Sequence, residues 1–390
     1  MRNFVSERAK RVKPSGIRKF FDLAAGRKDV ISLGVGEPDF ITPWYIRDAG
    51  ISAVKSGYTQ YTSNKGLTEL RAEISEYLAA RFGARFDKEN IVVTLGASEA
   101  IDISLRAVVD AGDEVLVPDP SYVSYAPCVE LLGGVPVSVP TSGENGFKLT
   151  PENLESVITP KTKALIFPYP NNPTGGIMEK EYIEKIIPVI LKHDLLVISD
   201  EIYAELTYGA KHCSIASFPE LENRVVLING FSKAFAMTGW RIGFACAPAE
   251  IFAAMLKIHQ YAAICAPIFS QYAAFAALNV GKKDGFSAVE EMRAEYDKRR
   301  RFMLGAFNRA GLDCFEPKGS FYVFPCVKST GLTGEEFATH LLKEKSVAVV
   351  PGSAFGEFGR DYIRCSYAYS MDALKRATDK IAEFVSEIRK

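Results

Sequence analysis

Residues 225–243 read VVLINGFSKAFAMTGWRIG, and this stretch joins a typical buried strand to an unusual pair of cations. The run 225-VVLI-228 is continuously apolar, which is typical of a strand that is covered on both faces of its sheet. Lys233 and Arg241 follow it among apolar and small residues. A lysine can bury its stem while its ammonium reaches water, so a surface position is the plain alternative. A functional interpretation of the two cations therefore needs partners elsewhere in the chain.

Further runs of the same kind alternate with helical patterns through the middle of the chain. The β-rich runs are 91-IVVTL-95, 115-VLVP-118, 135-VPVSV-139, 164-ALIF-167 and 196-LVIS-199. Helical patterns lie between them, as at 98–111 and 179–194. This alternation predicts an α/β fold, in which a mainly parallel sheet lies between layers of helices.

The C-terminal part of the chain has a different pattern. A long charged helical segment at 287–311 precedes two short β-rich runs, 320-SFYVFP-325 and 347-VAVVP-351. A final helix is expected at 371–390. These elements predict a second, smaller α+β domain, and the basic run 298-KRRR-301 is interpreted as a solvated helix face.

Length and composition limit the organisation and the partners. With 390 residues the chain suits two domains, and we expect a large one over 41–285 and a small one formed by 1–40 and 286–390. Lys and Arg together number 47, as do Asp and Glu, so the charge balance favours neither a nucleic acid nor an anionic membrane as partner. No apolar run reaches the roughly 18 residues of a membrane-spanning helix.

The cysteines and the start of the chain favour a cytoplasmic protein. Seven cysteines are scattered without a C-x-x-C pair, which favours free thiols over a disulfide framework. The basic N-terminus lacks the apolar core of a secretory signal, and Glu7 and Pro14 do not suit a transit peptide, so an arm of the mature protein is expected. Four histidines lie far apart without a metal-binding spacing, so no metal site is predicted.

Polar residues follow the ends of several expected strands. Gly96, Ala97 and Ser98 come after the first of them and open a helix, where free N–H groups favour an anion. Asp200 follows a later strand, and helix capping is the plain alternative for it. The segment 168-PYPNNPTGG-176 follows another, and an ordinary turn is its plain alternative. In a doubly wound sheet, ligands bind outside the carboxyl ends of the strands, so these residues are expected to share one site.

A pyridoxal phosphate site requires this combination of groups: a lysine that forms an imine, a carboxylate for the ring nitrogen and a cup for the phosphate. A desolvated, partly deprotonated lysine forms imines with carbonyl compounds, and Lys233 can supply that amine. Asp200 can supply the carboxylate, and the 96–98 turn together with Arg241 can supply the cup. Their coincidence on successive strand ends favours the functional interpretation of the two cations over the surface one.

The chain resembles, over essentially its full length, the fold-type I, aspartate-aminotransferase-like family of pyridoxal-phosphate enzymes. The most specific motifs are 170-PNNPTGG-176, 200-DEIY-203 and 231-FSKAFAMTGWRIG-243. The resemblance implies a homodimeric aminotransferase. Such an enzyme moves an amino group from an L-amino acid to a 2-oxo acid such as 2-oxoglutarate by ping-pong chemistry.

The resemblance also implies roles for single residues around the cofactor. Lys233 would bind the cofactor covalently and later move a proton, and Asp200 would keep the ring nitrogen protonated. Tyr203 and Asn172 would donate hydrogen bonds to the 3-oxygen of the ring. The full set of implied cofactor-binding residues in one subunit is Gly96, Ala97, Ser98, Tyr122, Asn172, Asp200, Ile202, Tyr203, Ser232, Lys233 and Arg241.

Three further residues complete what the resemblance implies. Arg364 would grip the α-carboxylate of the substrate as a bidentate fork, with Asn172 beside it. Gly36 would bring its backbone to the same carboxylate. Tyr61 would reach the cofactor phosphate of the neighbouring subunit, which would put the site at a dimer interface.

The chain also departs from the pattern of the family. Many relatives have a serine phosphate ligand three residues before the lysine, and this chain has Gly230. Dicarboxylate specialists bind the distal carboxylate with an arginine in the region of 264–271 or with a lysine in place of Ser98, and neither cation is present. Aromatic or broad-range donors are therefore favoured. Aspartate aminotransferase activity is the alternative, because a cation from elsewhere, including the N-terminal segment, could serve.

Two other functional classes share part of this pattern. A β-lyase or a decarboxylase of the same fold stays open, because the outcome depends on which Cα bond is aligned. A cofactor-binding module without turnover is disfavoured, because a binder has no need for the complete set Lys233, Asp200, Asn172, Tyr203 and Arg364.

Overall fold

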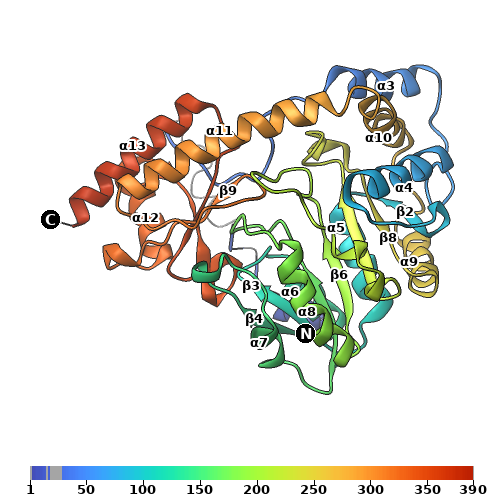
Figure 1. The fold of residues 1–390 in the computed structure, drawn as a ribbon, viewed down its shortest axis with the longest axis horizontal. Helices are drawn as coiled ribbons and strands as arrows, with labels where there is room; N and C mark the ends of the chain where they lie inside the picture. Colours follow the sequence, from blue (N-terminus) through green and yellow to red (C-terminus); the bar gives the residue numbers. More distant parts are fainter. Residues whose placement is uncertain (1, 15, 18–28, 390) are drawn as a thin grey trace.

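The computed structural model describes residues 2–14, 16–17 and 29–389, and its centre is a seven-stranded sheet (Figure 1). The strand order is β2-β8-β7-β6-β5-β3-β4. All neighbouring pairs are parallel except those that β8 forms with β2 and with β7. The strands are β2 (Ile91–Thr94), β3 (Glu114–Asp119), β4 (Val135–Pro140), β5 (Thr162–Phe167), β6 (Leu196–Asp200), β7 (Val225–Gly230) and β8 (Gly243–Cys246).

The α/β prediction is confirmed, because each expected run of the middle region forms a strand of this sheet. Successive residues of one strand point to opposite faces: Leu165 belongs to one hydrophobic cluster, and Ala164 and Ile166 belong to another. Strand β8 was not predicted. It has four residues and begins at a glycine, which leaves too short an apolar pattern for recognition.

Helices cover both faces of the sheet. Helices α5 (Ala97–Val108), α6 (Tyr125–Leu132) and α9 (Ala249–Ala262) contribute to the cluster that contains Ala164. The other cluster receives residues of α3 (Trp44–Lys55), α4 (Thr68–Phe82), α7 (Pro151–Glu155), α8 (Lys180–Lys192) and α10 (Ile268–Gly281). The covered faces explain why the central strands are apolar throughout.

A smaller group of elements lies at one end of this layer (Figure 1). An antiparallel sheet has the order β11-β12-β9, and β1 pairs in parallel with β10. The strands are β1 (Ile31–Ser32), β9 (Tyr322–Val323), β10 (Val347–Ala348), β11 (Val350–Pro351) and β12 (Ile363–Ser366). The helices are α11 (Ser287–Arg309), α12 (Gly334–Lys345) and α13 (Met371–Ile388).

Some expectations for this region need correction. The run 320–325 yields only the two residues of β9, and 347–351 divides into two strands of different sheets. The interpretation of 298–301 as a solvated face is wrong for Arg299 and Arg300, which are buried. Arg299 pairs with Asp39 and Arg300 pairs with Glu316, so acidic partners distant in sequence allow their burial.

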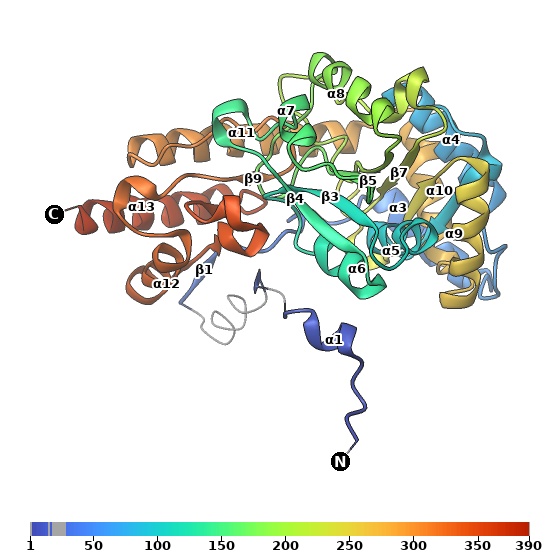
Figure 2. The same ribbon diagram turned by 90° about the horizontal axis from the view of Figure 1, so that it is seen from below.

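The start of the chain lies on the outside of the body, beside α6. Figure 2 shows the short helix α1 (Glu7–Arg11) below the main layers. Within the described part of the chain, no helix has the length and apolar character that a bilayer crossing needs.

Candidate active site

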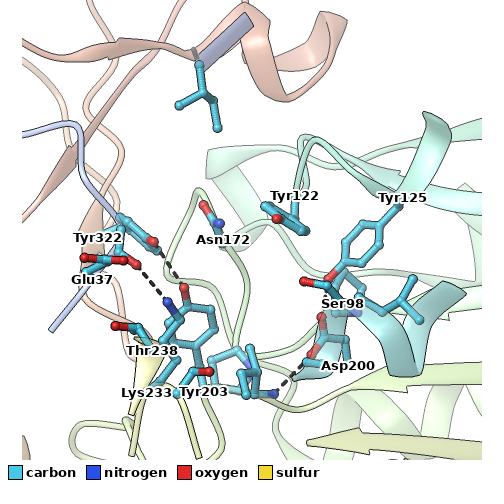
Figure 3. A pocket seen from close by; sticks show the side chains of 18 of the residues that line it. Glu37, Ser98, Tyr122, Tyr125, Asn172, Asp200, Tyr203, Lys233, Thr238 and Tyr322 are labelled. Carbon is cyan, nitrogen blue, oxygen red and sulfur yellow. Dashed lines mark hydrogen bonds between the residues drawn. The ribbon is translucent and has the colours of Figure 1, made fainter. Parts of the chain in front are cut away.

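A cavity of about 320 Å³ lies where the carboxyl ends of β6 and β7 meet the small sheet (Figure 3). It is the place that strand-end reasoning indicates for a ligand in a doubly wound sheet. Most of the predicted site residues line this one cavity. They are Gly36, Ala97, Ser98, Tyr122, Asn172, Asp200, Ile202, Tyr203, Ser232, Lys233, Arg241 and Arg364.

Two predicted residues do not line the cavity. Gly96 lies beneath its edge, where a Cβ atom would be 2.8 Å from Nη2 of Arg241. Tyr61 lies outside the cavity with 77% of its surface exposed, so it makes no contribution to the site of its own chain.

Lys233 follows β7 and directs its amine into the cavity. Its Nζ donates a hydrogen bond to the Gly36 carbonyl at 2.8 Å. Burial lowers the pKa of Lys233 to about 8, and the positive charges of Arg364 and Arg241 act in the same direction. Glu37 opposes this shift of the pKa. The amine is therefore neutral for much of the time near pH 8, as a nucleophile must be.

Asp200 ends β6 as a buried carboxylate that is held at both oxygens. The hydroxyl of Tyr125 donates to Oδ2 at 2.8 Å, and the backbone N–H of Ile202 donates to Oδ1 at 3.2 Å. Burial raises the pKa of Asp200 to about 6, although both hydrogen bonds and the charge of Lys233 lower it. A cationic N–H on the cavity side would stabilise the charged carboxylate, so the position suits a protonated ring nitrogen.

The N-terminus of α5 forms an anion-binding corner of the cavity. No side chain caps this helix, whose N-cap Gly96 has a φ of +83°. Arg241 is exposed beside it and donates to the carbonyls of Thr238 and Leu95. A Cβ on Gly243 would lie 2.7 Å from the backbone N of Ala97, so only glycine permits this close approach. Free N–H groups, the helix dipole and a guanidinium together suit a phosphate dianion.

Packing explains the missing serine at position 230. A Cβ on Gly230 would lie 2.9 Å from Cα of Gly243 and 3.3 Å from Cδ1 of Ile202. Because β7 and β8 pair at these two glycines, a larger residue would separate the strands. The corner therefore relies on backbone groups, Ser98, Ser232 and Arg241 as the available phosphate ligands.

Arg364 lies on β12 at the opposite end of the cavity. Its guanidinium lies between two rings, with Cζ 4.4 Å from the ring centroid of Tyr322 and 4.8 Å from that of Phe355. Nη1 donates to Oδ1 of Asn172 at 2.8 Å, and Nη2 donates to the carbonyl of Gly34 at 2.5 Å. Within the described residues no carboxylate pairs with Arg364, and its buried Nε has no partner. A buried cation of this kind suits an incoming carboxylate.

The donor set agrees with pyridoxal phosphate at each end of the cavity. An amine with a lowered pKa lies between a buried carboxylate and a phosphate-type corner, and a second guanidinium remains for a substrate. In the described ranges no group of three or more His, Cys, Asp or Glu side chains could hold a metal ion.

The comparisons with known proteins decide the family. The model of the family described as aminotransferase class I and II matches residues 28–381. The chain belongs to the class I and II aminotransferases. It is an enzyme of the fold-type I, pyridoxal-phosphate-dependent kind, as the resemblance predicted.

The aminotransferases to which this chain is similar are named for different amino donors. The chain is 50% identical to a putative aminotransferase, YugH, of Bacillus subtilis, with 99% of each chain covered. It is 48% identical to an aspartate aminotransferase of Pyrococcus abyssi, with 98% of each covered. The structure of an aromatic aminotransferase from Pyrococcus horikoshii is similar with a TM-score of 0.90 and 45% identity, covering 96% of this chain and 99% of that one. These names agree on the reaction and differ on the donor.

Several residues of this aminotransferase's cavity were not predicted as site residues, and Glu37, Tyr125 and Tyr322 are the ionisable ones among them. Tyr125 lies three residues after the predicted Tyr122, but nothing in the sequence alone directs it to Asp200. The hydroxyl of Tyr322 lies 3.1 Å from that of Tyr203, and Figure 3 shows the two facing each other. The run 320–325 is apolar without alternation, so it does not mark Tyr322 as a cavity residue, and Glu37 lies in an irregular segment without such a signal.

Proposed function

We propose that this aminotransferase transfers the amino group of an aromatic or broad range of L-amino acids to a 2-oxo acid such as 2-oxoglutarate. The observation that supports it best is the pairing of two groups in one cavity. Lys233 has a pKa of about 8, and Arg364 is a buried guanidinium without a carboxylate partner among the described residues. Amine chemistry and carboxylate recognition thus meet at one place.

Different residues of the cavity would hold different parts of the cofactor. Lys233 would hold the aldehyde carbon covalently, and Asp200 would keep a proton on the ring nitrogen. Tyr203 and Asn172 would donate to the 3-oxygen, while Tyr122 and Ile202 would cover the ring faces. The phosphate ligands would be Gly96, Ala97, Ser98, Ser232 and Arg241.

The chain's own groups would then act on the substrate. Arg364 binds the α-carboxylate through its fork, and the backbone of Gly36 lies close by. The free amine of Lys233 would take the proton from the substrate Cα and would hold it for its return. When bound, pyridoxal phosphate supplies the electron sink that stabilises the carbanion. The hydrogen bond from Lys233 to the Gly36 carbonyl gives its amine a defined position when it holds no carbonyl compound.

We propose a homodimer with shared sites, in which Tyr61 reaches the phosphate of the partner. The exposed side chain of Tyr61 supports this role. Ile41, Ile51, Val54 and Phe269 are exposed as well and line one apolar groove, as expected for a surface that a second subunit covers.

We also propose a large domain over 41–285 and a small one of 1–40 and 286–390. The hydrophobic cluster that contains Ala164 lies wholly within 41–285, and most residues of the cluster around Phe321 lie in 1–40 and 286–390. Both observations support this division, as does the pairing of β1 with β10. The seven free thiols support a cytoplasmic location.

The charges of the cavity support an aromatic or broad donor rather than aspartate. Glu37 lines the cavity, and its carboxylate would repel a distal carboxylate. The cations in the described lining are Lys233, Arg241 and Arg364, each of which has another role in the proposal. A cation from the N-terminal segment was the alternative, and the basic residues of 18–28 lie outside the described part of the chain.

A donor panel tests the proposed reaction. Each single L-amino acid is incubated with 2-oxoglutarate, and glutamate, oxo acid, ammonia and carbon dioxide are measured. We expect equal amounts of glutamate and oxo acid without ammonia, with phenylalanine and tyrosine ahead of aspartate. Release of ammonia would favour the β-lyase, and release of carbon dioxide the decarboxylase.

The pKa of Lys233 predicts how the cofactor-free protein takes up pyridoxal phosphate. The neutral amine is the nucleophile, and its fraction rises as pH increases towards the pKa of about 8. The uptake rate, followed by visible absorbance, should rise about tenfold between pH 6.5 and 7.5 and level off above about pH 9. A rate that continues to rise towards pH 10.5, the ordinary value for lysine, would contradict the lowered pKa.

Changing Glu37 tests the argument on the donor. Glu37→Gln keeps the size of the side chain and removes its negative charge. The ratio of kcat/KM for aspartate to that for phenylalanine should rise about fivefold, which corresponds to removal of about 1 kcal/mol of repulsion. The matched control is Glu184→Gln on the exposed side of α8, which should leave the ratio unchanged. An unchanged ratio in Glu37→Gln would show that this carboxylate does not select the donor.

A further inference from the structure

Asp119 is a buried carboxylate at the end of β3, outside the cavity and without an assigned role. It is 9% exposed, and in the described part of the chain no lysine or arginine pairs with it. It accepts hydrogen bonds from the Ser138 hydroxyl at 2.8 Å and from the backbone N–H groups of Glu357 and Phe358 at 3.1 and 3.2 Å. A buried carboxylate is costly unless it is hydrogen-bonded, and burial raises the pKa of Asp119 while these hydrogen bonds lower it.

These contacts join the large sheet to a segment next to the small one. Ser138 lies on β4 beside β3, whereas Glu357 and Phe358 begin a short 3₁₀ helix of 357–359. A second link runs in parallel, because the backbone N–H of Ser121 donates to the carbonyl of Phe355 at 3.0 Å. The segment 355–358 is therefore attached to the end of β3 at several points.

Gly356 makes this close approach possible. Its φ is +139°, and a Cβ at this position would lie 1.9 Å from Oδ1 of Asp119. Only glycine combines such a backbone conformation with such a small distance. The geometry at 356 thus serves the contact with the Asp119 carboxylate.

The attached segment also carries one of the rings that hold Arg364. Phe355 is buried, and its ring centroid lies 4.8 Å from Cζ of Arg364, while that of Tyr322 lies 4.4 Å from the same atom. A shift of the segment would move this ring and with it the guanidinium between the two rings. A route of direct contacts therefore leads from the Asp119 carboxylate to the guanidinium of Arg364.

We propose that Asp119 is a positioning residue for substrate recognition, which holds segment 355–358 against β3 so that Phe355 fixes the guanidinium of Arg364 for the substrate carboxylate. The inference rests on the proposed role of Arg364 as the carboxylate fork. It assigns Asp119 no contact with substrate or cofactor. A capping role for the 357–359 turn alone would predict lower stability without a selective effect on carboxylate binding.

The test compares two probes on the holoenzyme by calorimetry. 3-Phenylpropanoate has a carboxylate and no amine, whereas 2-phenylethylamine has an amine and no carboxylate. Asp119→Asn keeps the shape but offers one acceptor oxygen where two N–H groups need partners. We expect Asp119→Asn to raise the dissociation constant of 3-phenylpropanoate about tenfold and to change that of 2-phenylethylamine less than about twofold. KM for the amino donor should rise by a larger factor than kcat falls. Gly356→Ala should act in the same way, because its Cβ displaces the segment from Asp119.

Asp87→Asn is the matched control, since Asp87 caps another 3₁₀ helix, 88–90, away from the cavity. It should leave both probes unchanged. The proposal would be overturned if Asp119→Asn weakened the binding of both probes equally, or if it weakened the binding of neither. If Asp119→Asn does not fold, Phe355→Leu is used instead. Selective loss of 3-phenylpropanoate binding would again support the proposal, and equal loss or no loss for both probes would overturn it. The variant Arg364→Leu separates failure of this proposal from failure of the proposed function. If Arg364 is not the carboxylate fork, Arg364→Leu will leave the binding of 3-phenylpropanoate unchanged.

Discussion

Replacing Lys233 with alanine is expected to remove the covalent attachment of the cofactor and to lower turnover by about 10⁴-fold or more. Lys233 is the lysine that lines the described cavity, and its Nζ lies 2.8 Å from the Gly36 carbonyl, next to the expected substrate position. The variant loses the nucleophile for the cofactor and the base for the Cα proton together. Removal of a partly buried amine with a lowered pKa leaves no unpaired charge, so the thermal midpoint of unfolding should change little.

The measurements are kcat with the best donor and the visible spectrum after incubation with pyridoxal phosphate. Lys161→Ala is the matched control, because Lys161 is an exposed lysine in a turn before β5. It should retain wild-type activity and spectrum. Activity of Lys233→Ala within about tenfold of wild type would refute the assignment of Lys233.

Asp200→Asn is expected to lower kcat by about 10³-fold while the protein still binds the cofactor through Lys233. The amide keeps the shape and a hydrogen bond with Tyr125, but it cannot hold a positive charge on the ring nitrogen. The carbanion then lacks its electron sink, so the loss appears in kcat for every donor rather than in KM for one of them.

Single-turnover kinetics with a series of donors checks the Asp200 prediction. Asp379→Asn on the exposed side of α13 is the control and should have wild-type rates. A loss confined to cofactor affinity, with normal kcat at saturating pyridoxal phosphate, would assign Asp200 to cofactor binding alone.

Most of the fold could be predicted from sequence because its strands are buried on both faces. Runs such as 164–167 and 196–199 are apolar or nearly so, and the helices between them have the expected period. The short strands of the small sheet are harder to predict from the sequence. Strand β9 has two residues, and its partners in β12 lie 42 and 44 positions later, which no local pattern encodes.

The site could be predicted in part, because residue types at strand ends and the family motifs point to the same chemistry. Contacts between residues that are far apart in the sequence could not be predicted. The amine of Lys233 meets the carbonyl of Gly36 across 197 positions, and Arg299 meets Asp39 across 260. Nothing local distinguishes Arg299 from its exposed neighbour Arg301 on the same helix, so its burial follows from tertiary packing alone.

The most direct test of the central claim is the visible absorbance of the wild-type protein loaded with pyridoxal phosphate, through both half-reactions. A single L-phenylalanine addition should convert the absorbance of the lysine-bound cofactor into that of the aminated form, and 2-oxoglutarate alone should then restore the original spectrum. This cycle requires Lys233 and Asp200 to act on the bound cofactor while Arg364 holds the carboxylate of the substrate in the same cavity. A protein that binds no pyridoxal phosphate, or whose spectrum responds to no amino acid, would contradict the account.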